Sequence, residues 1–214
     1  FHTKVIFLLK ITFIKMLITK FSEHKMEAGI DEAGRGSLVG PVTAAAVILD
    51  NDLKIPCLND SKKLSSIKRY ELRKIIEETA IAYSVSFVDC KTIDKINILN
   101  STLKAMHNSI ENLKIKPSFI LVDGNRFRPY KNILHKCVVN GDQKYSNIAA
   151  ASILAKTYRD DYMESIHQKF PIYDWENNKG YGTMHHIEMI RKYGKTIFHR
   201  ESFKLKSDQL KLSL

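Results

Sequence analysis

The sequence is poor in cysteine and contains no long apolar run. Its three cysteines, Cys57, Cys90 and Cys137, form no CxxC pair, which argues against a zinc site and against a disulfide framework. The longest apolar run near the N-terminus, residues 5–9, is too short for a signal-peptide core and far below the roughly 20 residues that a membrane span needs. We therefore expect a protein of the reducing cytoplasm without a membrane segment.

Positive charge, in contrast, is abundant. The formal net charge is +11 and the pI is about 9.5. Because the chain begins with Phe, we expect residues 1–15 to be non-native upstream sequence and Met16 to be the natural start. Without the three lysines of residues 1–15, the charge falls from +11 to +8. Clustered Lys and Arg release counterions from phosphates, so a polyanion is the expected partner, unless the charge only reflects a basic proteome.

Hydrophobic periodicity indicates strands that alternate with helices. Apolar or alternating runs predict a short strand ending at Ile30 and further strands at residues 41–49, 82–88, 118–122 and 138–139. Helices are predicted after a cap at Ser65 or Ser66 and over residues 96–113, 147–167 and 183–193, the last ended by Gly194. This order is typical of an α/β domain with a mixed sheet and a helical C-terminal part.

Acidic residues follow three of the apolar strands. Asp31 and Glu32 follow the first strand, Asp123 follows residues 118–122, and Asp142 follows the strand at 138–139. Ligand sites of open α/β sheets cluster at strand ends, so these acids can converge, although each could also be a solvated turn residue. Four close carboxylates need cations between them, and oxygen ligands suit Mg²⁺ or Mn²⁺. Two such ions are a common device for phosphodiester hydrolysis.

A glycine-rich turn follows the first pair of acids. Gly34-Arg35-Gly36 is part of a near miss for a dinucleotide fingerprint, because Val39 stands where the third glycine should be. It misses the P-loop pattern as well, since Arg35-Gly36 replaces Lys-Ser/Thr. The turn instead offers backbone N–H groups to a phosphate or a ribose hydroxyl, unless it is an ordinary turn before a strand.

The motifs as a set closely resemble the ribonuclease HII family of type 2 ribonucleases H. The resemblance covers about residues 27–203 and rests on the segments 29–36 (GIDEAGRG), 40–42 (GPV), 60–64 (DSKKL), 123–125 (DGN), 141–142 (GD), 150–156 (AASILAK), 159–160 (RD), 180–183 (GYGT) and 199–203 (HRESF). One departure is Asn140, where the family usually has Lys before the Gly-Asp pair.

This resemblance implies a ribonuclease H-like fold, a five-stranded mixed sheet flanked by helices. It also implies two-metal hydrolysis with Mg²⁺ or Mn²⁺, which leaves 5′-phosphate and 3′-hydroxyl ends. Its substrates would be RNA–DNA hybrids and single ribonucleotides embedded in duplex DNA. The family's motifs assign metal binding and catalysis to four carboxylates, Asp31, Glu32, Asp123 and Asp142. They assign the ribose 2′-hydroxyl to Gly34, Arg35 and Gly36, and the adjacent sugar to Tyr181.

Several other residues are candidates for substrate contact. Lys144, Lys156 and Arg159 could bind backbone phosphates, or could form a solvated helix face. We interpret His185, His186 and His199 as packing or surface residues, with His186 a weak candidate near the substrate. Trp175 could stack on a base, but a lone Trp is more often a core anchor.

We expect three parts in the chain, with a change of role near residue 170 as the boundary between the last two. We assign residues 1–25 to an N-terminal extension, 26–170 to the catalytic domain and 171–214 to a helical, substrate-binding part. From residue 191 onward there are seven basic residues against two acids, so this end could extend the duplex-binding surface. Two rival functions are another nuclease of the same fold and a catalytically inactive duplex-binding protein. We expect a monomer, and a sliding clamp is a conceivable partner that the sequence does not specify.

Overall fold

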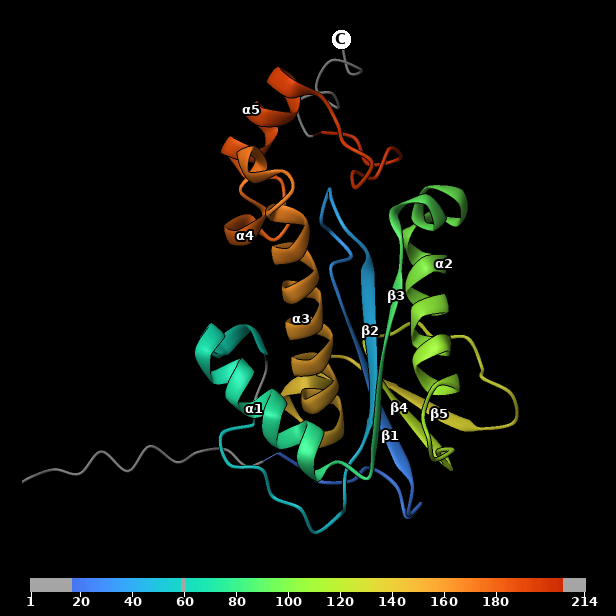
Figure 1. The fold of residues 1–214 in the computed structure, drawn as a ribbon. Coiled ribbons are helices and arrows are strands. Elements are labelled where there is room, and N and C mark those ends of the chain that lie inside the picture. The colour runs from blue at the N-terminus through green and yellow to red at the C-terminus, as the bar shows by residue number, and fades with distance from the viewer. Residues whose placement is uncertain (1–16, 59–60, 206–214) are drawn as a thin grey trace, which may run out of the picture.

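Five strands form one mixed sheet in the computed structural model, which describes residues 17–58 and 61–205 (Figure 1). The strands are β1 (Glu27–Ala33), β2 (Val42–Ile48), β3 (Ala82–Val88), β4 (Phe119–Asp123) and β5 (Leu134–Val138). Their order in the sheet is β3-β2-β1-β4-β5. The first three strands pair antiparallel, while β4 and β5 run parallel to β1. The predicted five-stranded mixed sheet is confirmed. The expectation about residues 1–15 and Met16 lies outside the described residues.

Helices cover both faces of this sheet. They are α1 (Ser66–Thr79), α2 (Cys90–Glu111), α3 (Ser146–His167), α4 (Trp175–Asn178) and α5 (Met184–Tyr193). Figure 1 shows α2 on one face and α1 with α3 on the other. The side chains of β2 divide accordingly, since Ala44 and Ala46 belong to the core cluster under α2, whereas Ala45 and Val47 belong to the cluster under α1 and α3. This alternation is what a strand with both faces covered requires.

Helix α3 approaches the sheet unusually closely. Its residues Ala149, Ala150 and Ala151 are fully buried, and the helix packs over β1 and β2. A Cβ atom on Gly29 of β1 would lie 2.2 Å from the backbone carbon of Asn147. The Asn147 side chain also bridges the two layers, since its Nδ2 donates to the carbonyl oxygen of Glu27 at 3.1 Å. The small residues on both sides therefore fix α3 against the strand that carries Asp31.

The C-terminal part packs around the far end of α3. Val39, Met163, Tyr173, Trp175 and Ile190 belong to one buried cluster that joins α3, α4 and α5. Figure 1 shows α4 and α5 gathered at that end, away from α1. Trp175 is fully buried, so its interpretation as a core anchor is confirmed. None of the helices in the described ranges has the length and apolar character to cross a membrane.

Three predicted element boundaries were wrong. The strand expected at residues 138–139 is β5, which ends at Val138 and whose residues alternate between exposed and half-buried at the edge of the sheet. Helix α2 begins at Cys90 after an Asp89 cap, and a non-helical Asn97 with φ of 65° interrupts it, so its polar first turns hid the start. Strand β1 continues to Ala33, because Glu32 still pairs with Ala44 of β2.

Candidate active site

Three of the four predicted carboxylates line one cavity of about 280 Å³: Asp31, Glu32 and Asp123. Ile30 of β1 pairs with Val122 of the parallel strand β4, so the next residues, Asp31 and Asp123, lie side by side at the same end of the sheet. Asp31 is only 6% exposed. The convergence that the sequence suggested is thus present for these three acids.

The cavity holds negative charge in a poorly solvated place. Burial raises the pKa of Asp31 well above its usual value, and the neighbouring Glu32 and Asp123 carboxylates raise it further. Burial also raises the pKa of Glu32, which Arg35 counteracts through an ion pair of 3.0 Å between Nη1 and Oε1. Carboxylates in this environment repel one another, and a bound cation would relieve that repulsion.

Asp142 lies beside this group rather than in the cavity lining. It is 4% exposed and sits in a 3-10 turn, Gly141–Gln143, directly before α3. The backbone N–H of Gly141 donates to Oδ1 of Asp123 at 2.7 Å, which ties the turn to the end of β4. Asn140, at the family's Lys position, adopts φ of 54° and ψ of 44°, a left-handed conformation that Asn tolerates well.

The donor chemistry of these residues fits a divalent cation. All four are carboxylates, the hard oxygen ligands that Mg²⁺ and Mn²⁺ prefer. Across the described ranges, however, no three His, Cys, Asp or Glu side chains are already grouped closely enough to hold an ion. The carboxylates would have to turn toward a common centre, and Glu32, whose Oε1 pairs with Arg35, has Oε2 outside that pair.

The glycine-rich turn forms another wall of the same cavity. Gly34, Arg35 and Gly36 all line it, and Arg35 and Gly36 are exposed. Gly34 has φ of +85°, and a Cβ there would lie 2.0 Å from Nε of Arg159, so only glycine fits. Among the described residues, neither the N–H of Arg35 nor that of Gly36 has a hydrogen-bond acceptor. These two donors are therefore available to a ligand.

Two buried arginines hold the turn from behind. Arg200 donates from Nη2 to the carbonyl oxygen of Gly34 at 2.7 Å and from Nη1 to that of Arg35 at 2.9 Å. Arg159 donates to Oγ of Ser37 at 2.7 Å and to the carbonyl oxygen of Pro41 at 3.1 Å. Both arginines are 1% exposed. The phosphate contact suggested for Arg159 is therefore wrong, and Arg200 is not part of an exposed basic end.

Tyr181 lies next to the glycine turn and lines the same cavity. Its side chain is 42% exposed and lines the cavity, and a Cβ on Gly36 would be 3.9 Å from its Cε1. The guanidinium of Arg159 lies 5.7 Å from the Tyr181 ring centre. The backbone oxygen of Tyr181 also contacts Nδ1 of His186 at 2.9 Å, and His186 is fully buried. His186 is thus a buried residue that packs under Tyr181, in agreement with its interpretation as a packing residue.

Lys144 does not line this cavity. Its side chain is exposed, and its Nζ donates to the carbonyl oxygen of Val139 at 2.8 Å. Its backbone oxygen accepts from the N–H of Ile18 at 2.8 Å, so the segment before β1 braces the turn that carries Asp142. Contact between Lys144 and a phosphate stays a prediction.

Sequence reasoning left three cavity-lining residues without a role: Ser61, Lys62 and Ser152. Lys156, a candidate for phosphate contact, lines the same cavity, and that contact stays a prediction. The hydroxyls of Ser61 and Ser152 are 2.9 Å apart, and a hydrogen bond from Ser152 lowers the pKa of Asp31 against the effect of burial. Lys156 forms an ion pair with Asp160 one helical turn on. Ser61, Lys62 and Ser152 could have been found from the sequence only because they belong to the motif segments 60–64 and 150–156. Their residue types alone do not indicate a role.

Comparisons with known proteins bear on the family and the fold of this chain. The model of the family described as Ribonuclease HII matches residues 28–206. Ribonuclease HII of Christiangramia forsetii is 58% identical over 86% of this chain and 93% of its own, and that of Bacteroides fragilis is 54% identical over 92% and 98%. Among solved structures, ribonuclease HII in the PCNA complex from Archaeoglobus fulgidus has a TM-score of 0.72 and 28% identity, over 85% of this chain and 96% of its own. The chain therefore belongs to the ribonuclease HII family and is a ribonuclease H, a divalent-metal-dependent endoribonuclease whose products are 5′-phosphomonoesters.

Proposed function

We propose that this chain cuts the RNA strand of RNA–DNA hybrids and incises duplex DNA on the 5′ side of a single embedded ribonucleotide. The observation that carries the proposal is the shared cavity, in which Asp31, Glu32 and Asp123 face the Gly34-Arg35-Gly36 turn. A phosphodiester that lies against the acids would place its neighbouring ribose within reach of the turn. Cleavage of the phosphodiester and recognition of the ribose would then take place in the same cavity.

The four carboxylates are proposed to bind the Mg²⁺ or Mn²⁺ ions. Asp31 and Asp123 are held at the ends of adjacent parallel strands, and Asp142 is tied to Asp123 through the Gly141 N–H. A pair of divalent cations supplies an activated water and stabilises the charge on the leaving oxygen. The protein's part is to place its carboxylates and to keep them ionised despite burial, which costs stability until the cations bind.

The turn is proposed to distinguish ribose from deoxyribose. The free N–H groups of Arg35 and Gly36 can donate to a 2′-hydroxyl, a group that DNA lacks. Arg200 fixes the carbonyl oxygens of Gly34 and Arg35, so the peptide planes of the turn are held in place before substrate arrives. Tyr181, whose ring lies beside Gly36 in the same cavity, is proposed to pack on the adjacent sugar.

One gel with two substrates tests the function. With Mg²⁺ or Mn²⁺, the protein is expected to nick a DNA duplex that contains one ribonucleotide, on its 5′ side, and to leave an all-DNA duplex intact. Cleavage of both duplexes would favour another nuclease of this fold and would refute recognition of the 2′-hydroxyl. Cleavage of neither, with binding retained, would favour an inactive duplex-binding protein.

A substitution in the acidic group links the activity to the site. Asp31→Asn is expected to abolish nicking while duplex binding persists at low salt, because phosphate contacts elsewhere are unaffected. Asp52→Asn, which changes an exposed residue outside the cavity, is the matched control and should nick normally. Retained activity of the Asp31 variant would place the metal site elsewhere. The complex with PCNA solved for the Archaeoglobus fulgidus relative supports a sliding clamp as a protein partner to be tested separately.

A further inference from the structure

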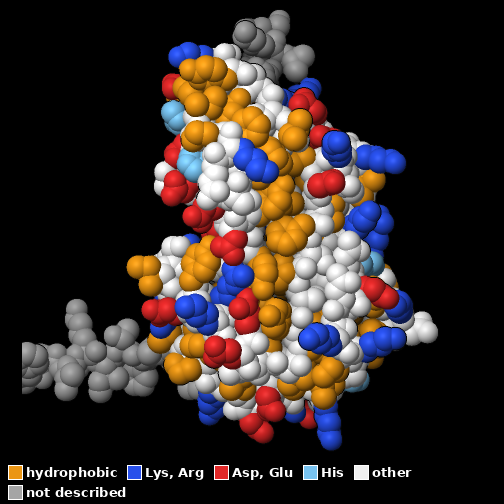
Figure 2. Space-filling view, viewed as in Figure 1, with side chains coloured by type: hydrophobic (Ala, Val, Ile, Leu, Met, Phe, Trp, Pro, Cys, Tyr) orange, Lys and Arg blue, Asp and Glu red, His pale blue; other side chains and the backbone are white. Residues whose placement is uncertain are grey.

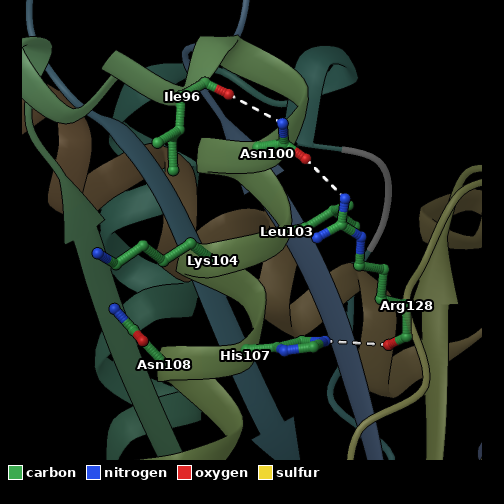
Figure 3. A pocket seen from close by; sticks show the side chains of 7 residues that line it. All are labelled: Ile96, Asn100, Leu103, Lys104, His107, Asn108 and Arg128. Carbon is green, nitrogen blue, oxygen red and sulfur yellow. Dashed lines mark hydrogen bonds between the residues drawn. The ribbon is translucent and has the colours of Figure 1, made fainter. Parts of the chain in front are cut away.

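A second groove runs along the outer side of α2, away from the acidic cavity. It has a volume of about 490 Å³ and is lined by Asn100, Leu103, Lys104, His107 and Asn108 of α2 and by Arg128 of the loop between β4 and β5. We call it the α2 groove. Figure 3 shows Lys104 and Asn108 on one side of the groove and Arg128 on the other, with Leu103 and His107 between them.

The groove carries net positive charge, although Asp89, which borders a neighbouring pocket with Lys104, interacts electrostatically with that lysine. Within the described part of the chain, no carboxylate lies within ion-pair distance of Lys104 or Arg128, and no acid is part of the lining. Arg128 donates from Nη2 to the amide oxygen of Asn100 at 2.9 Å, which orients the guanidinium without neutralising it. Figure 2 shows several Lys and Arg side chains, with some Asp and Glu among them, along the α2 edge of the molecule. Such a surface favours an anionic ligand.

The loop that carries Arg128 is firmly attached to α2. The Phe127 ring packs edge-on against His107 at 5.3 Å, and it belongs to the partly buried residues over the core under α2. Nε2 of His107 contacts the backbone oxygen of Arg128 at 3.0 Å. Because Phe127 points inward, Arg126 and Arg128 on either side of it are presented to the surface. The position of Arg128 in the groove is therefore fixed by the packing of its loop on α2, and not only by the conformation of a long side chain.

A third cavity connects the α2 groove with the acidic site. This cavity, of about 340 Å³, shares Glu32, Arg35 and Asp123 with the acidic site and Leu103 with the α2 groove, and Arg126 lines it as well. No acid of the described residues lies within ion-pair distance of Arg126. An extended polyanion could therefore run from the catalytic carboxylates past Arg126 to Arg128 and Lys104 along one path.

We infer that the α2 groove binds the phosphate backbone of the duplex on one side of the cleavage point, with Arg126, Arg128 and Lys104 as phosphate contacts. The inference rests on the proposed function, because it takes the occupant of the groove to be the duplex held at the acidic cavity. Amide and imidazole groups of Asn100, Asn108 and His107 suit sugar and phosphate oxygens. Binding there should extend the footprint without adding sequence preference.

Salt dependence of binding is the direct test. Each phosphate contact steepens the plot of log affinity against log salt concentration by about 0.9. One contact therefore makes binding about eightfold more sensitive to a change from 0.1 M to 1 M salt. The double variant Lys104→Gln/Arg128→Gln should therefore lower the slope by about two units. Binding is measured by fluorescence anisotropy in EDTA, on a DNA duplex with one ribonucleotide, so that no cleavage occurs. The variant Lys104→Arg/Arg128→Lys keeps both charges and should keep most of the slope.

Two controls separate the groove from net charge. Lys116→Gln/Lys131→Gln removes the same charge from exposed positions outside the groove, one of them already paired with Glu111 at 2.7 Å. It should change the slope little. Duplexes extended only on the 5′ side or only on the 3′ side of the ribonucleotide should show the effect of the groove variant on one side alone. Equal losses in the groove and control variants, or on both sides, would overturn the inference.

Failure of the groove to bind phosphates can be distinguished from failure of the proposed nicking activity. The groove variant should still nick on the 5′ side of the ribonucleotide when the duplex is saturating, since none of its changed residues lines the acidic cavity. If the unaltered protein fails to nick, the proposed function is wrong, whereas the slope measured in EDTA still reports whether the groove binds phosphates.

Discussion

The guanidinium of Arg200 donates a 2.7 Å hydrogen bond from Nη2 to the carbonyl oxygen of Gly34, across 166 positions of sequence. The same side chain reaches the carbonyl oxygens of Arg35 and Gly40. Burial lowers the pKa of Arg200 to about 10, so it remains charged at neutral pH. A residue near the C-terminus thus holds the turn that we propose to inspect the ribose.

Arg200→Lys should therefore damage activity more than folding. A lysine keeps the charge but cannot reach three carbonyl oxygens with one ammonium group, so the turn loses part of its support. Hydrogen bonds to charged groups contribute about 1.5–3 kcal/mol each, and we expect a lowered melting temperature. In steady-state kinetics, at a temperature where circular dichroism shows the variant folded, kcat should fall tenfold or more with little change in KM. Arg191→Lys, at an exposed position of α5, is the control. An unchanged kcat would remove Arg200 from the mechanism.

Asp31→Asn should stabilise the metal-free protein while it removes activity. The pKa of Asp31 is raised in the fold, so stability is greatest below the unfolded value of 3.8 and is lost as pH rises through the folded value. Above that folded value the carboxylate is ionised at a cost, and an uncharged isostere avoids that cost. Thermal melts in EDTA should show a higher melting temperature for Asp31→Asn and no change for Asp52→Asn.

Divalent ions should reverse the order of the two melting temperatures, so that the unaltered protein becomes more stable than Asp31→Asn. Ions that bind only the folded state raise its stability, so Mg²⁺ or Mn²⁺ should raise the melting temperature of the unaltered protein more than that of Asp31→Asn. Equal shifts in both proteins would contradict the assignment of Asp31 as a metal ligand.

The C-terminal part should loosen in mild acid. Burial, reinforced by His186, lowers the pKa of His199 to about 4, and burial also lowers the pKa of His186. Both histidines are therefore neutral in the fold but take up protons when it unfolds. Their contribution to stability is complete above the unfolded value of 6.5 and is lost as pH falls toward about 4.

Trp175 offers a local probe of that change, because it is the single tryptophan of the sequence. Its Nε1 donates to Nε2 of His186 at 3.0 Å, and a protonated His186 could not accept this bond. Trp175 fluorescence should therefore change as pH falls below 6.5, before the far-UV circular dichroism does. His186→Gln should shift this transition, whereas the exposed His185→Gln should not. Coincident transitions in all three proteins would show that His186 is not the titrating group.

Much of the sheet and the acidic group could be predicted because both follow from local patterns. Strand β2 is buried along its length and apolar except for Thr43, and Asp31 and Asp123 lie near the ends of paired parallel strands, so their meeting is a consequence of sheet topology. The buried arginines could not be predicted in this way. Arg159 and Arg200 have no carboxylate partner in the described residues and bond to carbonyl oxygens and a hydroxyl, so their burial depends on backbone that is brought together only by the fold. Sequence reasoning treats an arginine of that kind as a surface residue.

Substitution by alanine at two glycines of the same motif should affect different properties: stability at Gly29 and activity at Gly36. A Cβ at Gly29 would lie 2.2 Å from backbone of α3, so Gly29→Ala must push the helix off the sheet, at a cost of about 1–3 kcal/mol or more. A Cβ at Gly36 meets only the Tyr181 ring at 3.9 Å, so Gly36→Ala should leave the melting temperature almost unchanged. The new methyl group would instead stand in the cavity where we place the ribose. Gly36→Ala should therefore lower kcat/KM on the ribonucleotide-containing duplex while thermal melts remain normal. If both variants lose stability together, or if Gly36→Ala cuts normally, the turn does not approach the sugar as proposed.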